Sequence, residues 1–200
     1  GYNVFLFDFR AHGQSEGRFT SLGYYERRDL LAAIQYLKGR GIRRVGLLGF
    51  SMGAAVAMST APDSPAVSAV VADCGFGQLW HAAARGALGF GVPYPLAGAI
   101  GWLIVLLASL RLGAPLWTAD PIRHVGKISP RPLLIIQGGR DRLVPTHAAR
   151  RLFAVAREPK ELWIVFEAEH RAVDQVVPDA YYERVLGFFD RRLLFDNSSP

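Results

Sequence analysis

The sequence has little cysteine and no concentrated block of charge. Its 200 residues include one cysteine, Cys74, so no intrachain disulfide can form. A lone thiol suits a reducing compartment, and we expect a cytoplasmic protein. The formal net charge is +6, but the arginines are scattered in short pairs, without a basic block that carries interleaved aromatic residues. We therefore expect no nucleic-acid partner.

The first residues lack the features of a secretory leader. The opening "GYNVFLFDF" has no methionine and no basic region before a longer apolar stretch, so it is not a signal peptide. It is typical of a strand already in progress. We therefore expect that the sequence is a fragment that begins partway through a domain.

Apolar runs and helical patterns alternate along most of the chain. Short apolar runs predict strands, and spacings of three to four residues predict helices. The expected strands are 3–9, 44–50, 66–72, 132–137 and 161–167, and the expected helices are 24–38, 52–60, 146–156 and 179–194. Strands that are apolar throughout and alternate with helices predict an α/β fold, with a mostly parallel sheet covered by helices on both faces.

Residues 75–125 interrupt this alternation and are too long for a simple crossover. Residues 86–110 carry no formal charge, and "LAGAIGWLIVLLASL" is apolar enough to raise a membrane span. A span would place two halves of one sheet on opposite sides of a membrane, and Pro93 and Pro95 shorten the apolar stretch. A helical cap insertion over a core of 1–74 and 126–200 is favoured, while interfacial membrane contact through 96–110 stays open.

The sequence "GFSMG" lies where a predicted strand meets a predicted helix. This pattern, Gly-x-Ser-x-Gly, is the nucleophile elbow, in which a serine stands on a sharp turn. Side chains at Gly49 and Gly53 would collide with neighbouring backbone, so glycine is expected at both positions. We expect Ser51 to be a nucleophile and the backbone N–H of Met52 to face a developing oxyanion.

A serine nucleophile needs a base and an orienting carboxylate. His170 follows the last predicted strand and is the expected base, with His12 as a distant alternative. Asp141 follows the strand 132–137 and is the expected acid. Asp73, at the end of another strand, competes for that role, although chain order favours Asp141.

These pieces resemble the α/β-hydrolase fold family, in the branch of bacterial hydrolases labelled serine aminopeptidase-like or BEM46-like. The resemblance rests on "NVFLFDFRAHGQSEG", "GFSMG", "ADPI", "PLLIIQGGRDRLVP" and the "EH" before the final helix. It implies Ser51 as nucleophile, Asp141 as acid, His170 as base and the Met52 amide as one oxyanion donor. It specifies the fold far better than the substrate, because this fold hosts many chemistries.

The resemblance also implies a departure from the family pattern. Family members carry three strands before the one that opens this chain, and the loop after the third usually supplies the second oxyanion N–H. We therefore expect that donor to be missing upstream. That third strand would lie between 3–9 and 44–50, so a gap in the middle of the sheet is expected.

The expected activity is hydrolysis of carboxylic esters or thioesters of apolar acyl groups through an acyl-enzyme. Trp80, Phe90 and Trp102 of the insertion are the expected pocket residues. No metal or cofactor is expected, because the histidines are dispersed and no phosphate-loop pattern occurs. The alternative is a non-catalytic or membrane-associated relative, or an inactive fragment. The oligomeric state is not predicted.

Overall fold

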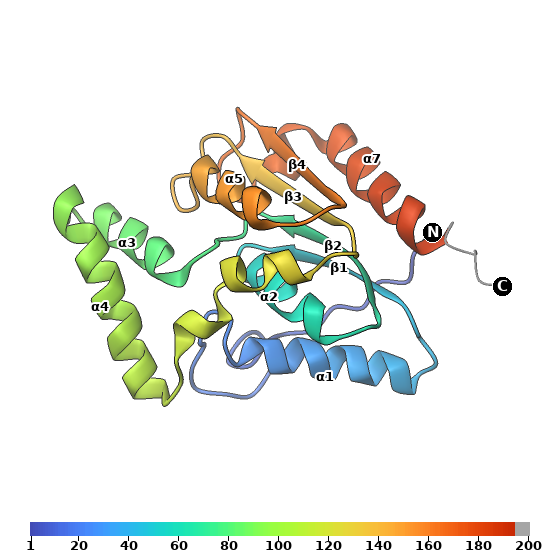
Figure 1. The fold of residues 1–200 in the computed structure, drawn as a ribbon, viewed down its shortest axis with the longest axis horizontal. Helices are drawn as coiled ribbons and strands as arrows, with labels where there is room; N and C mark the ends of the chain where they lie inside the picture. The colour runs from blue at the N-terminus through green and yellow to red at the C-terminus, as the bar shows by residue number, and fades with distance from the viewer. Residues whose placement is uncertain (195–200) are drawn as a thin grey trace.

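The computed structural model describes residues 1–194 and contains a four-stranded parallel sheet (Figure 1). The strands stand side by side in chain order. They are β1 (Val45–Phe50), β2 (Val67–Asp73), β3 (Leu133–Gly138) and β4 (Lys160–Val165). Phe50 is paired with Asp73, Asp73 with Ile136, and Gly138 with Val165. The carboxyl ends of the strands therefore lie together at one edge of the sheet.

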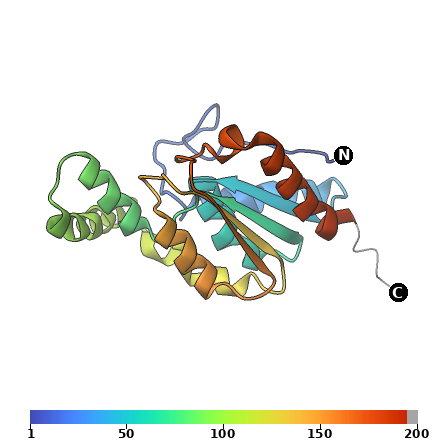
Figure 2. The same cartoon turned by 90° about the horizontal axis from the view of Figure 1, so that it is seen from above.

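Helices cover both faces of this sheet (Figure 2), as the apolar strands predict. One face packs against α1 (Glu26–Gly39), α2 (Met52–Thr60) and α5 (Thr146–Val155). The other face packs against α6 (Val173–Val176) and α7 (Pro178–Phe189), which continues as a π-helical turn, η5 (Asp190–Leu194). The fold class is thus the predicted α/β arrangement.

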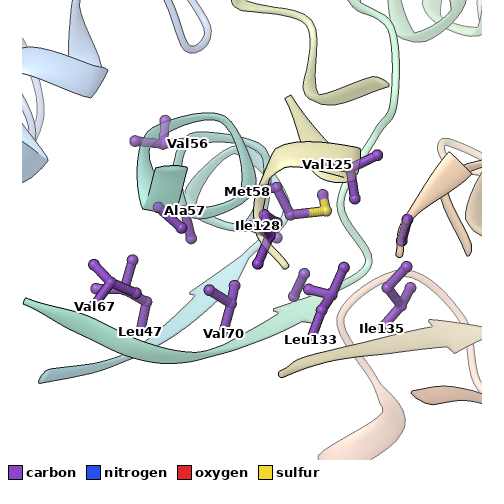
Figure 3. Packing of buried hydrophobic residues seen from close by; sticks show 14 of the residues in the cluster. Leu47, Val56, Ala57, Met58, Val67, Val70, Val125, Ile128, Leu133 and Ile135 are labelled. Carbon is purple, nitrogen blue, oxygen red and sulfur yellow. The ribbon is translucent and has the colours of Figure 1, made fainter. Parts of the chain in front are cut away.

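Successive side chains of the central strands point alternately into two buried clusters, one on each face of the sheet. In β2, Val70 points into the cluster below α2, whereas Val71 points into the cluster below α7. Figure 3 shows the first cluster, in which Met58, Val125 and Ile128 lie over the sheet. All three side chains are essentially inaccessible to solvent, and each contributes about 1.5–3 kcal/mol through burial.

The segment 75–125 forms a helical hairpin that projects beyond the sheet (Figures 1 and 2). Its two helices are α3 (Leu79–Gly89) and α4 (Tyr94–Leu112). Three 3₁₀ turns follow the hairpin: η2 (Leu116–Ala119), η3 (Pro121–Arg123) and η4 (Val125–Lys127). A further 3₁₀ turn, η1 (Ala61–Asp63), lies earlier in the chain, between α2 and β2. Because Val125 is buried in the core cluster, the last residues of the segment pack with the sheet domain.

Helix α4 buries one narrow stripe and exposes the rest of its apolar surface. The buried stripe repeats every four residues and consists of Ala97, Gly101, Val105 and Ser109. Large side chains that are 45–71% exposed surround it: Leu96, Trp102, Leu103, Ile104, Leu106, Leu107 and Leu110. The window Pro95–Leu112 has a mean hydropathy of 1.8 and is 22% buried, so its length and composition would allow a membrane span. One such helix is weak evidence of a span.

The predicted strand over residues 3–9 is wrong. These residues join no ladder, and Val4 and Leu6 are 77% and 85% exposed. An apolar run becomes a strand only when another strand satisfies its backbone groups, and none within residues 1–194 pairs with it. Aromatic contacts hold the segment instead, such as Phe5 stacked on Tyr36 of α1 with ring centroids 5.6 Å apart. In the described structure β1 is an edge strand, so the expected gap inside the sheet is replaced by an open edge.

Candidate active site

Three side chains from different strand ends meet at the carboxyl edge of the sheet. Ser51 directly follows β1, Asp141 lies three residues after β3, and His170 lies five residues after β4. His170 Nε2 is 3.0 Å from Ser51 Oγ, and His170 Nδ1 is 2.7 Å from Asp141 Oδ2. The structure therefore places the three predicted residues in one continuous hydrogen-bonded chain.

The backbone of Ser51 adopts a conformation that residues other than glycine rarely adopt. Its φ is 51° and its ψ is −113°, and its N–H donates a 2.8 Å hydrogen bond to the carbonyl of Asp73. A Cβ atom on Gly49 would lie 2.3 Å from the carbonyl oxygen of Gly53, so glycine is required at position 49. The same expectation for Gly53 is wrong, because outside the backbone of its own helix no described atom lies within 4 Å of a Cβ built there.

The backbone N–H of Met52, at the start of α2, is a free hydrogen-bond donor in the described structure. Met52 is the first helical residue, and its N–H makes no hydrogen bond to any part of the chain that the structure describes. Helix N-termini leave such donors free and carry a partial positive charge. The arrangement suits a negative charge that develops beside Ser51 Oγ.

Four hydrogen bonds fix the carboxylate of Asp141. Its side chain is fully buried, and Oδ1 accepts backbone N–H groups of Leu143 at 2.9 Å and Val144 at 2.8 Å. Oδ2 accepts a 2.9 Å hydrogen bond from Gln137 in addition to the one from His170. Burial would raise the pKa of Asp141, but these hydrogen bonds outweigh it and hold the pKa below its usual value. The group is therefore a fixed anion that orients the imidazole.

Asp73, the competing carboxylate, contacts other partners. It is buried at the end of β2, where Tyr181 donates a 2.8 Å hydrogen bond to Oδ2 and Arg171 lies 3.5 Å from the same oxygen. Burial raises the pKa of Asp73 despite these partners. Its backbone carbonyl accepts the Ser51 N–H, so Asp73 supports the turn, and the described hydrogen bonds of His170 go to Asp141 and Ser51 instead.

Cys74 lies close to Asp141 and His170. The ligand atoms of Cys74, Asp141 and His170 fall within 4.8 Å of one another. Burial and the neighbouring Asp73 raise the pKa of the Cys74 thiol to about 12, and a neutral thiol is a poor metal ligand. His170 and Asp141 are already bonded to each other, so the donor set fits a proton relay better than a metal site.

His12, the alternative base, braces a loop. Its Nδ1 lies 2.8 Å from the carbonyl oxygen of Arg10, and its side chain is exposed. Gln137 is a supporting residue that the sequence analysis missed. A polar residue at the end of the apolar run "PLLIIQ" was the available signal, because a buried amide needs a partner.

The three expected pocket residues do not lie together. Trp80 and Trp102 stack with ring centroids 5.4 Å apart. Trp80 lines a cavity of about 350 Å³, and Trp102 lines a second of about 410 Å³ with Leu103, Leu106, Trp117 and Arg123. Phe90 is 93% exposed after the end of α3 and lines neither cavity. Only the two tryptophans therefore remain candidates for substrate contact.

Comparisons with known proteins place this geometry in a family. The model of the Alpha/beta hydrolase family matches residues 1–184. The uncharacterized protein YqkD of Bacillus subtilis is 32% identical over 196 residues, which cover 95% of this chain and 63% of YqkD. The human protein ABHD12B is 31% identical over 166 residues, covering 78% of this chain and 42% of ABHD12B.

A solved structure has a similar fold. The esterase Pf2001 of Pyrococcus furiosus is 31% identical, with a TM-score of 0.76 over 96% of this chain and 72% of that chain. The chain thus spans about three fifths of the length of YqkD and nearly three quarters of the Pf2001 chain. The family match, the relatives and the common fold establish that this chain belongs to the Alpha/beta hydrolase family.

Proposed function

We propose that this protein is a serine hydrolase that cleaves carboxylic esters or thioesters of apolar acyl groups. The observation that carries the proposal is the chain of contacts from Ser51 Oγ through His170 to the buried, ionised Asp141. A hydroxyl hydrogen-bonded to an imidazole whose second nitrogen meets a carboxylate is the arrangement that makes serine nucleophilic.

The reaction would proceed in two halves. Ser51 Oγ bonds to the substrate carbonyl carbon while its proton passes to His170 Nε2, and the carbonyl oxygen becomes an anion facing the Met52 N–H. The tetrahedral adduct then expels the alcohol or thiol, which receives the proton from His170, and leaves an ester on Ser51. Water, deprotonated by His170, attacks that ester and releases the acid, returning the proton to Ser51.

The preference for apolar acyl groups follows from the hairpin of residues 75–125, which we propose acts as a cap. Four apolar side chains line its cavity beside Trp102, namely Trp102, Leu103, Leu106 and Trp117, and Arg123 is the charged lining residue. Each methylene buried there would contribute about 0.8 kcal/mol to binding. The similar structure of an esterase from Pyrococcus furiosus supports oxygen esters as the first substrates to test.

We also propose that α4 contacts a lipid surface. Seven large apolar side chains, spread around most of the helix, are 45–71% exposed, and no charged residue occurs in α4 before Arg111. A protein partner would cover one face, whereas a bilayer interface accepts apolar side chains over a broad arc. The net charge of +6 favours anionic lipids.

Covalent labelling tests the hydrolase directly. We expect a fluorophosphonate probe to form an adduct on Ser51, identified by mass spectrometry of the labelled peptide. Ser51→Ala should abolish the adduct. His170→Ala should lower p-nitrophenyl ester turnover by about six orders of magnitude, because the serine loses its base.

His12→Ala is the matched control, because His12 braces a loop and contacts no residue of the chain from Ser51 to Asp141. It should leave turnover within about twofold of the parent protein. Failure of a folded parent protein to label would contradict the hydrolase and favour a non-catalytic member of the family.

A further inference from the structure

The cavity of about 350 Å³ lies between α3, the start of α4 and the start of α5, and we call it the α3–α5 cavity. Ser51, Asp141 and His170 are not among its lining residues. It borders the catalytic chain, since Leu143 and Val144 of its wall donate backbone hydrogen bonds to Asp141. Its chemistry differs from that of the apolar cavity beside Trp102.

Two pairs of basic side chains line this cavity. His81 and Arg85 are one turn apart on α3, and His147 and Arg151 are one turn apart on α5. No acidic residue is among the lining residues, and none of the four takes part in an ion pair within residues 1–194. The guanidinium groups of Arg85 and Arg151 are permanently charged, so positive charge on two sides of a cavity without an acidic lining residue points to an anionic ligand.

The two pairs influence each other across the cavity. Burial lowers the pKa of His81, and the positive charges of Arg151 and His147 lower it further. Arg85 is oriented by a 3.0 Å hydrogen bond from its Nε to the carbonyl oxygen of Arg142, and the rest of its guanidinium makes no other hydrogen bond to the described chain. The positive potential is therefore built from groups held on two separate helices.

A buried donor in the wall also lacks a partner. Trp80 Nε1 is inaccessible to solvent and makes no hydrogen bond in the described structure. Helix α5 begins beside the cavity with Pro145 as N-cap, so no side chain caps its first N–H groups. Unsatisfied buried groups are costly, and a free helix N-terminus favours negative charge.

We propose that the α3–α5 cavity binds the anionic group, a carboxylate or a phosphate, of a small amphiphile. Arg85, Arg151 and the start of α5 would bind the anion, and Trp80 Nε1 would donate a hydrogen bond to one of its oxygens. Leu88 and Leu143 would contact the apolar part. The proposal concerns binding and stands whether or not the protein is a hydrolase.

Calorimetric titration of the full chain with four eight-carbon probes tests the charge and its source. Octanoate carries a carboxylate, octyl phosphate carries a phosphate, octanol is neutral and octyltrimethylammonium is cationic. At least one anion should bind roughly tenfold or more tightly than octanol, since hydrogen bonds to charged groups add this much. The ratio of the two anions identifies the preferred group. Equal affinities for anionic, neutral and cationic probes would overturn the proposal.

Matched variants locate the site. Arg151→Gln should weaken binding of the preferred anion roughly tenfold, whereas Arg150→Gln, next to it on α5 but outside the cavity lining, should not. Trp80→Phe keeps an aromatic ring but removes the N–H, and it should weaken the anion more than octanol. Undiminished anion binding in Arg151→Gln and Trp80→Phe would place the site elsewhere and overturn the assignment. Because these readouts need no turnover, their failure is distinct from that of the hydrolase proposal.

Discussion

At the scale of single residues, the candidate site depends on one close backbone approach and one fixed anion. Gly49 permits the strand to pass directly against the first turn of α2, and this approach presents Ser51 with a positive φ. Asp141 receives four hydrogen bonds, so its orientation does not depend on His170 alone. Substitution should therefore be costly at Gly49 and well tolerated at Gly53.

Substitution of the two glycines of the elbow tests this difference. Gly49→Ala would place Cβ 2.3 Å from a backbone oxygen of the helix, so the turn must shift. We expect a loss of about 1–3 kcal/mol in the free energy of unfolding, together with slower probe labelling of Ser51 in the folded protein. Urea unfolding and labelling rates measure the two effects.

Gly53→Ala is the control for this experiment. It meets open space on a helix, so the free energy of unfolding should stay the same or rise by up to about 1 kcal/mol. Equal destabilisation by both substitutions would show that the close approach at Gly49 is not the reason for glycine there.

At the scale of elements, α3 is held by a buried carboxylate distant in sequence. Asp120 Oδ1 accepts a 2.9 Å hydrogen bond from the N–H of Leu79, the first residue of α3, whose own N-cap residue makes no side-chain hydrogen bond. Burial raises the pKa of Asp120 to about 6, and the Leu79 N–H and Arg123 offset only part of this shift. The start of the helix is therefore sensitive to pH.

Asp120 should make the protein less stable as pH rises from about 4 to 6. In this range the native protein retains a proton that the unfolded chain, with a pKa near 3.8, has lost. The free energy of unfolding should fall by up to about 3 kcal/mol and then level off above pH 6. Asp120→Asn keeps an acceptor for Leu79 and removes the charge, so it isolates this effect.

Urea unfolding at several pH values gives the comparison. Relative to the parent protein, the Asn variant should become progressively more stable between pH 4 and 6. Parallel pH profiles for the two proteins would show that Asp120 does not carry this dependence.

At the scale of the whole molecule, an α/β domain with a net charge of +6 carries a projecting apolar hairpin (Figure 1). Two contributions therefore act together in the proposed lipid contact: electrostatic attraction to anionic lipids and burial of apolar side chains of α4. They can be separated by experiment, because salt weakens the electrostatic attraction and leaves the apolar burial largely unchanged.

Co-sedimentation with vesicles measures both contributions. We expect binding to phosphatidylglycerol–phosphatidylcholine vesicles to exceed binding to pure phosphatidylcholine, and to weaken with salt. Leu107→Asp with Leu110→Asp should reduce binding at least tenfold, because both side chains are more than half exposed on α4. Leu186→Asp, an exposed apolar position on α7, is the matched control and should have little effect.

Two results would count against the lipid contact. One is an equal loss of binding in Leu186→Asp. The other is concentration-dependent association without vesicles that the α4 substitutions abolish, because it would identify a second copy of the chain as the partner.

Local sequence patterns determined most of the elements and the candidate nucleophile. The helix 52–60 and the strand ends before Ser51 and Asp141 follow from apolar periodicity and glycine placement, which act over a few neighbouring residues. The sheet order at the carboxyl edge then brings Ser51, Asp141 and His170 together, as chain order predicts.

Only the tertiary structure decided features that depend on distant partners. It directed Asp73 toward Tyr181, a partner distant in sequence that no local pattern indicates. It left the apolar residues 3–9 without a strand, because pairing requires a neighbour that local pattern does not supply. It also exposed Phe90 and gathered the basic pairs of α3 and α5 around one cavity, since the approach of two helices is set by packing.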